Sequence, residues 1–261
     1  MTEYNRIVIK IGTSTLAHDT GLLNIRRVES LVKVLSDIKN SGREIIIVSS
    51  GAIGMGMGKL GLKRGFADMP TRQACAAVGQ GALMHTYDML FCDHHHNIAQ
   101  VLLTRDVIDD AQRKINITNT LGRLLELGCI PIVNENDTVA TEEIEFGEND
   151  ILSAMVAVLI KADLLIMLTD TDGLYDSSPE DNMNARLISR VNEIDDRIRQ
   201  MAGGTGSRLG SGGMTTKIEA AAYAGEFGVP TVVTNGAHPK RLYDILEGKN
   251  IGTMFQLTID N

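Results

Sequence analysis

The chain has 261 residues, of which 43% are hydrophobic, and this is enough for one large core, so we expect a single domain over residues 1–261. The 25 Lys and Arg residues against 33 Asp and Glu residues give a formal net charge of −8, with no densely basic segment, which argues against nucleic-acid binding. No signal peptide is recognisable, the longest apolar run covers only about half of a membrane span, and three cysteines in no CxxC pair fit a reducing compartment, so we expect a cytoplasmic protein that contacts no membrane.

Short β-rich runs alternate with longer helical patterns, which is typical of βαβ units and predicts a mostly parallel sheet with helices on both faces. In such sheets ligands bind beyond the carboxyl ends of the strands, so the polar residues at those ends are the candidates for function. The expected strands are Ile7–Ile11, Glu44–Val48, Ile98–Leu103, Ile130–Val133, Leu164–Leu168 and Thr231–Val233. The expected helices are Arg26–Asn40, Thr71–Phe91, Ile115–Leu127, Ile151–Lys161, Val191–Met201, Lys217–Phe227 and Pro239–Glu247.

The first two strands both end in residues suited to an anion. Lys10 lies in an otherwise apolar strand, where an ammonium group is costly to bury without a partner, although an edge lysine that reaches solvent is an equal alternative. Gly12, which follows, allows a tight turn over a ligand. The second strand ends in Ser50-Gly51-Ala52, whose small side chains and free N–H groups indicate a second cradle for an anion or a carboxylate.

Two other patterns carry no function in our interpretation. Residues 56–61 match GxGxxG, but the match begins several residues after its strand and no acidic strand end follows about 20 residues later, as a dinucleotide site requires. No GxxxxGK[ST] pattern is present either. His94, His95 and His96 are consecutive, so they cannot all face one ion from an extended chain, and we expect a solvated loop.

Three polar clusters follow the later strands. Residues 134–137 read Asn-Glu-Asn-Asp. Asn and Asp are good turn residues, but four consecutive hydrogen-bonding side chains are too many for a turn alone and suit a ligand with both ammonium and carboxylate groups. Asn149 and Asp150 precede a helix, where either could be an N-cap, but beside the first cluster we expect a shared site. Thr169 and Asp170 end another strand, just before an Asp-Gly turn signal.

The glycine-rich segment at residues 203–217 has six glycines and ends in Lys217, directly before a strongly helix-forming run. Backbone N–H groups at a helix N-terminus, with an ammonium group beside them, form a phosphate site. The alternative is a flexible linker. A linker, however, need not end at a helix start that carries a lysine, so we favour the phosphate site.

In this combination and order the chain resembles the amino acid kinase family, and within it the members that phosphorylate glutamate. Many such members continue into a C-terminal PUA domain, which we expect to be absent from this chain. The resemblance covers essentially the whole chain and rests on residues 9–14, 48–53, 100–104, 132–137, 149–154, 168–175 and 210–217.

The resemblance implies an α/β fold, a three-layer αβα sandwich around a central, mostly parallel open sheet, with substrate bound mainly by the N-terminal part and ATP mainly by the C-terminal part. It implies ATP-dependent phosphorylation of the side-chain carboxylate of L-glutamate, the first step of proline biosynthesis, with Mg²⁺, a homo-oligomeric state and proline as a feedback inhibitor. Another kinase of this family, acting on acetylglutamate, aspartate, carbamate or a nucleoside monophosphate, and a non-catalytic ligand sensor are the alternatives. A sensor would have lost a phosphate-facing lysine.

The chemistry needs positive charge and positioning rather than a general base, because a carboxylate with a pKa of about 4 is already ionised at neutral pH. By resemblance, Lys10 and Lys217 contact the transferring phosphoryl group, with the N–H groups of Gly12 and Gly51 as further donors, and Asp150 holds the two ammonium groups apart. Mg²⁺ is held by phosphates and water, so we name no protein ligand for it.

The resemblance also assigns the binding residues. Glutamate is assigned to Ser50, Gly51, Asn134, Asp137 and Asn149, and Asp137 binds its α-ammonium group. ATP is assigned to Lys10, Gly12, Thr169, Asp170, Ser211, Gly212, Gly213, Met214, Thr215, Thr216 and Lys217.

Overall fold

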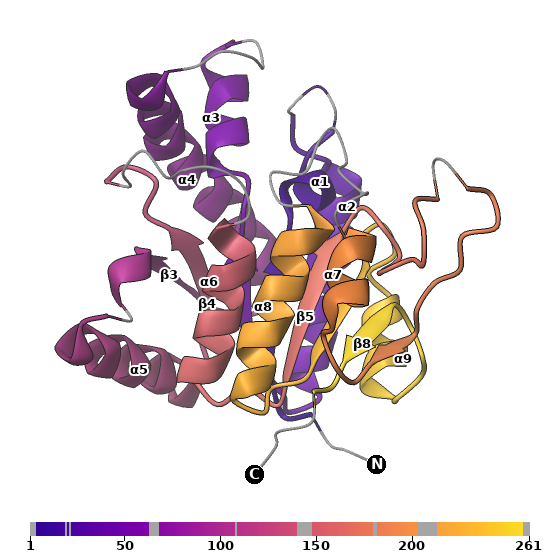
Figure 1. Ribbon diagram of the computed structural model, residues 1–261. Helices are drawn as coiled ribbons and strands as arrows, with labels where there is room; N and C mark the ends of the chain where they lie inside the picture. The colour runs from indigo at the N-terminus through magenta and orange to yellow at the C-terminus, as the bar shows by residue number, and fades with distance from the viewer. Residues whose placement is uncertain are drawn as a thin grey trace.

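A computed structural model of the chain (Figure 1) describes residues 4–18, 20, 22–62, 68–107, 109–139, 148–179, 182–202 and 213–257. The strands in these residues are β1 Arg6–Ile11, β2 Glu44–Ser49, β3 Ile98–Leu103, β4 Ile130–Glu135, β5 Leu164–Thr169, β6 Arg190–Val191, β7 Thr231–Asn235 and β8 Thr253–Phe255. They form one sheet in the order β3-β4-β2-β1-β5-β7-β8-β6. Neighbouring strands are parallel except β7 and β8.

Helices cover both faces of this sheet, and α6 and α8 lie side by side in front of it in Figure 1. The α-helices among the described residues are α1 Thr13–Leu16, α2 Ile25–Asn40, α3 Ala52–Lys59, α4 Met69–Cys92, α5 Ala111–Glu126, α6 Glu148–Leu159, α7 Asp196–Ala202, α8 Met214–Glu226 and α9 Arg241–Leu246, with a 3₁₀ turn, η1, at Arg105–Val107. One buried cluster joins the sheet to α2, α4 and α9. The other joins it to α5, α6 and α8, so the expected three-layer fold is confirmed.

The alternation of side chains along β1 determines the face on which its lysine lies. Ile7 and Ile9 pack in the cluster of α2 and α4, whereas Val8 packs in the cluster of α6 and α8. Because side chains alternate with a period of two in a strand, Lys10 shares the face of Val8. The strand therefore directs the only charged side chain of its carboxyl half towards α6 and α8.

All six expected strands are present, and their ends agree with the expectation to within a residue or two. The expected helix over residues 191–201 is wrong in its first half, since β6 occupies its start and α7 begins only at Asp196. Helices α5, α6 and α8 each begin about a turn before the apolar pattern, because their first turns are polar. This places Asn149, Asp150 and Thr216 inside helices rather than in the loops before them.

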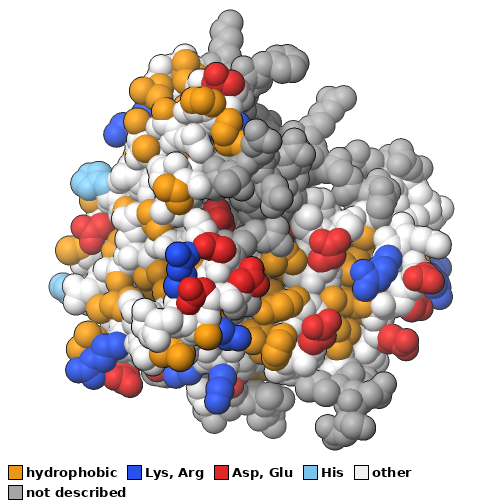
Figure 2. Space-filling model, turned by 60° about the vertical axis from the view of Figure 1, so that its left-hand side comes forward, with side chains coloured by type: hydrophobic (Ala, Val, Ile, Leu, Met, Phe, Trp, Pro, Cys, Tyr) orange, Lys and Arg blue, Asp and Glu red, His pale blue; other side chains and the backbone are white. Residues whose placement is uncertain are grey.

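Figure 2 shows one face of the molecule, on which acidic and basic side chains are interspersed and hydrophobic side chains gather over the projecting α3 and α4. Leu60 and Leu62, which follow α3, and Val78 of α4 are exposed. No helix among the described residues is long and apolar enough to cross a membrane.

Helices α3 and α4 pack with their backbones in direct contact. A Cβ atom at Gly56 would lie 1.8 Å from the carbonyl oxygen of Cys75, and one at Gly79 would lie 1.8 Å from that of Ala52. Any side chain at these two positions would therefore push the helices apart. The GxGxxG match belongs to this packing, since residues 56–59 lie in α3 and the rest in the turn that follows.

This packing makes a prediction about two glycines of α4. Gly79→Ala should lower the free energy of unfolding by about 3 kcal/mol, because the new methyl group collides with backbone atoms that cannot rotate away. Gly81→Ala is the matched control, since a Cβ atom there meets nothing within 4 Å, and it should raise stability by about 0.5–1 kcal/mol through helix propensity. Urea denaturation of both variants measures this, and equal effects would contradict the close packing.

Candidate active site

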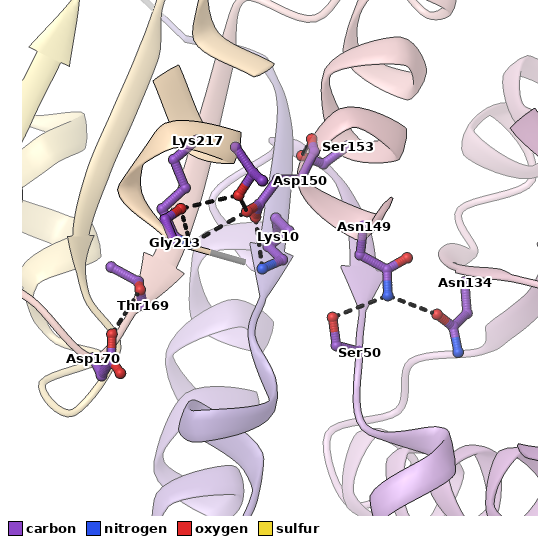
Figure 3. A network of polar contacts seen from close by, with 11 residues as sticks. Lys10, Ser50, Asn134, Asn149, Asp150, Ser153, Thr169, Asp170, Gly213 and Lys217 are labelled. Carbon is purple, nitrogen blue, oxygen red and sulfur yellow. Dashed lines mark hydrogen bonds and ion pairs between the residues drawn. The ribbon is translucent and has the colours of Figure 1, made fainter. Parts of the chain in front are cut away.

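The candidate site lies where the carboxyl ends of β1, β2, β4 and β5 meet the N-terminal turns of α3, α6 and α8 (Figure 3). At its centre is a buried carboxylate between two ammonium groups. Asp150 Oδ1 lies 2.7 Å from Lys10 Nζ, and Asp150 Oδ2 lies 3.2 Å from Lys217 Nζ. The residues are 0%, 7% and 4% exposed, respectively. The three charges, which are far apart in sequence, therefore form one unit with a net charge of +1.

Burial and pairing have opposite effects on these charges. Burial alone would raise the pKa of Asp150, but Lys10, Lys217 and the Thr216 hydroxyl outweigh it, so its pKa lies below the ordinary value. Burial lowers the pKa of Lys217, and Asp150 opposes that shift. The carboxylate thus keeps a buried ammonium group charged, which is what a site for a polyanion requires.

The helix N-cap alternative for Asn149 and Asp150 is wrong, because both side chains are used elsewhere. Asn149 Nδ2 donates to Ser50 Oγ at 2.9 Å and to Asn134 Oδ1 at 3.0 Å. Asp150 accepts from Thr216 Oγ1 at 2.7 Å in addition to its ion pairs. The expected substrate residues Ser50, Asn134 and Asn149 are therefore brought together by hydrogen bonds, on one side of the lysines in Figure 3.

The two glycines expected to donate backbone N–H groups differ in their surroundings. The Gly12 N–H already donates to the carbonyl of Leu168 at 3.2 Å, so the structure does not support its expected role as a phosphate donor. A Cβ atom at Gly12 would lie 3.6 Å from Lys10 Nζ, so the glycine instead leaves space beside the ammonium group. Gly51 is the N-cap of α3 with a φ of 102°, and its N–H donates to no carbonyl among the described residues.

Asp137 follows β4 in a turn, and its carboxylate accepts no hydrogen bond from the described residues. Burial raises the pKa of its carboxyl group to about 6, against the opposing charge of Arg72. This carboxylate forms no ion pair with the described residues, and an ammonium group of a ligand would supply a close cationic partner.

Of the residues expected to bind ATP, Thr169 and Asp170 lie on the other side of the lysines in Figure 3. Thr169 is buried at the end of β5 and donates to Asp170 Oδ1 at 3.0 Å. Gly213 is the N-cap of α8, and its carbonyl accepts from Lys217 Nζ at 3.4 Å. Met214 packs in the core, Thr215 is exposed and the Thr216 hydroxyl binds Asp150, so the side chains of this turn face three different ways. Ser211, Gly212 and most of the glycine-rich segment lie outside the described residues.

One buried contact of the site was not anticipated. Gln80 of α4 accepts from Asn134 Nδ2 at 2.9 Å. Its position in a long helix with no distinctive motif gives no signal in the sequence. Only the packing of α4 against β4 places it beside Asn134.

Comparison with known proteins shows the family. Residues 5–235 match the model of the amino acid kinase family. The chain belongs to the amino acid kinase family. Glutamate 5-kinase of Clostridium acetobutylicum is 52% identical over 255 residues, covering 98% of this chain and 96% of the relative. Glutamate 5-kinase of Listeria monocytogenes is 50% identical over 96% of this chain and 92% of the relative, and that of Moorella thermoacetica is 51% identical over 98% of this chain and 68% of the relative.

Solved structures of other kinases share the fold. UMP kinase from Bacillus anthracis has a TM-score of 0.67 at 17% identity, covering 98% of this chain and 97% of that one. Carbamate kinase from Giardia lamblia bound to AMP-PNP has a TM-score of 0.67 at 16% identity, covering 98% and 99%. At this sequence identity the similarity shows only the amino acid kinase fold. The assignment of the site residues rests on the distances and contacts described above.

Proposed function

We propose that this chain transfers the γ-phosphoryl group of ATP, bound with Mg²⁺, to the side-chain carboxylate of L-glutamate, giving glutamyl 5-phosphate in the first step of proline biosynthesis. The observation that carries the proposal is the buried unit of Lys10, Asp150 and Lys217, which lies between a cluster of hydrogen-bonded amides and the N-terminus of α8. Identity of about 50% to glutamate 5-kinases over nearly the whole chain supports the choice of substrate.

ATP supplies an activated phosphoryl group, and the protein supplies charge and alignment. The substrate carboxylate is an anion at neutral pH, so no residue needs to remove a proton. Lys10 and Lys217 would donate to the phosphoryl oxygens and reduce the repulsion between two anions. Asp150 fixes where the two ammonium groups lie, and the Gly51 N–H, at the positive end of α3, adds a further donor. These groups are in place before the reaction, so they need little reorganisation.

In this proposal the chain is one domain with two functional parts. Residues of β2, α3, α4 and β4 form the glutamate side, and residues of β5 and α8 form the nucleotide side. Asp150 of α6 lies between the two parts, where it pairs with Lys10 of β1 and with Lys217 of α8. A non-catalytic sensor is disfavoured, since both phosphate-facing lysines are present and paired.

The reaction can be tested directly. Release of ADP is measured with L-glutamate, aspartate, acetylglutamate and carbamate as acceptors, and the acyl phosphate is trapped with hydroxylamine. We expect a hydroxamate from glutamate alone. Equal or faster turnover with another acid would overturn the choice of substrate, and ATP consumption without a hydroxamate would overturn the reaction.

Asp137 should control how the glutamate reaction depends on pH. Because burial raises its pKa to about 6, protonation below that pH removes the partner of the substrate ammonium group, so kcat/KM for glutamate should fall as the pH drops through 6. Asp137→Asn should raise the KM for glutamate and remove this fall between pH 5 and about 7. The exposed Asp106→Asn serves as the matched control. A retained acid limb in Asp137→Asn, or a change in the KM for ATP alone, would contradict this role.

Three expectations stay predictions. The exposed Leu60 and Leu62, which follow α3, and the exposed Val78 of α4 support a homo-oligomer. Inhibition by proline and a cytoplasmic location follow from the proposed pathway.

A further inference from the structure

Three side-chain amides in the site form a chain of hydrogen bonds that begins outside the expected substrate residues. Asn149 donates to Asn134, and Asn134 donates to Gln80. Asn149 Nδ2 also donates to Ser50 Oγ. The chain thus joins α4, β4, α6 and the turn between β2 and α3, and we name these three amides the amide relay.

One backbone group determines the direction of every amide in the relay. The N–H of Glu135 donates to Asn134 Oδ1 at 2.9 Å, and because an N–H can only donate, this end of Asn134 must be the oxygen. Its Nδ2 group therefore faces Gln80, which must present Oε1 as the acceptor. By the same reasoning Asn149 presents Nδ2 to Asn134 and Ser50.

The relay leaves one polar atom without a partner at each end. Among the described residues, the buried Gln80 Nε2 has no acceptor and the buried Asn149 Oδ1 has no donor. Buried polar groups without partners are costly and uncommon. These two atoms lie at the two ends of one oriented chain of hydrogen bonds. Unsatisfied polar atoms in this arrangement are expected in a site that is built to bind a ligand rather than to stabilise the fold.

The packing of α4 fixes the start of the relay. Gln80 is only 9% exposed, and its neighbour Gly79 lies against the backbone of Ala52 in the first turn of α3. Ser50 and Gly51 directly precede that turn. Gln80 and the Ser50 end of the site therefore belong to one tightly packed unit, which α3 and α4 form together.

We infer that Gln80 is a positioning residue for glutamate, which acts through Asn134 by holding the amides of Asn134 and Asn149 in the orientation that the substrate needs. The inference rests on the proposed function. It assigns Gln80 no contact with the nucleotide or with the lysine pair. Its loss should therefore affect the binding of glutamate rather than the transfer step.

The test is a steady-state comparison of wild type and Gln80→Met, which keeps the side-chain length and the helix propensity but removes the acceptor. We expect the KM for glutamate to rise about tenfold, because the loss of one oriented hydrogen bond has an effect of about this size. The values of kcat and of the KM for ATP should be nearly unchanged. Gln112→Met is the matched control, because Gln112 is exposed and its side chain donates to Asn116 of its own helix. If Gln80→Met does not fold, Gln80→Ala, which only removes atoms, is measured in its place.

A double-mutant cycle tests whether Gln80 acts through Asn134. In the Asn134→Ala background, Gln80→Met should change the KM for glutamate by less than about twofold, because residues in one hydrogen-bond network are not additive. Additive effects, equal changes in both KM values, or an unchanged KM for glutamate in an active enzyme would overturn the inference alone. A wild-type chain that forms no hydroxamate from glutamate would overturn the proposed function and this inference with it.

Discussion

Lys217→Ala should reduce kcat by about a hundredfold or more, with a much smaller change in the KM for glutamate, and Lys10→Ala should do the same. Each ammonium group is buried and held by Asp150, so its charge is fixed in place before the reaction. Removing a fixed donor of this kind costs about 10²–10³ in kcat. Because the two lysines act as one unit, the double variant should lose less than the product of the two single losses.

Single-turnover and steady-state rates of hydroxamate formation measure these losses. Lys249→Ala is the matched control, since Lys249 is an exposed lysine paired with Asp244 and Glu247 on the surface, and its rates should match the wild type. Unfolding curves confirm that each variant is folded. Turnover near the wild-type level in Lys10→Ala or Lys217→Ala would show that the phosphoryl group is stabilised elsewhere.

The strands and the central lysine could be predicted from the sequence because both depend on local pattern. Short apolar runs predict where the strands lie. The alternation of side chains along β1, with a period of two, is enough to place Lys10 on the opposite face of the sheet from Ile9. The strand-end clusters at Asn134 and Thr169 were found for a similar reason, since the carboxyl ends of parallel strands meet at one edge of the sheet.

Other features depend on contacts that no local pattern encodes. Helix α3 contains Gly54, Gly56 and Gly58, which disfavour a helix on their own, and only the close packing against α4 makes Gly56 necessary. The role of Gln80 could not be predicted from the sequence for the same reason, because it depends on how α4 is placed relative to β4. The two-residue β6 and the three-residue β8 are too short to give a periodic signal.

Asp150→Asn should damage both activity and stability. The substitution keeps the shape of the side chain but removes the negative charge that pairs with both buried ammonium groups, and breaking a buried ion pair in this way costs about 3–5 kcal/mol of folding free energy. The misplaced lysines should also reduce kcat by about a hundredfold. Asp244→Asn, which removes a partner of the exposed Lys249 at the surface, is the matched control and should change stability little.

The loss of stability in Asp150→Asn should depend on pH in a defined direction. Burial lowers the pKa of Lys217 and Asp150 opposes this, so without Asp150 the pKa of Lys217 in the folded state falls further below that of the unfolded chain. Between these values the unfolded chain binds more protons, so the stability of the variant rises with pH. Urea denaturation at pH 7 and about pH 9 should therefore show a smaller difference from wild type at the higher pH. A difference that is constant or grows with pH would mean that Asp150 does not serve to keep Lys217 charged.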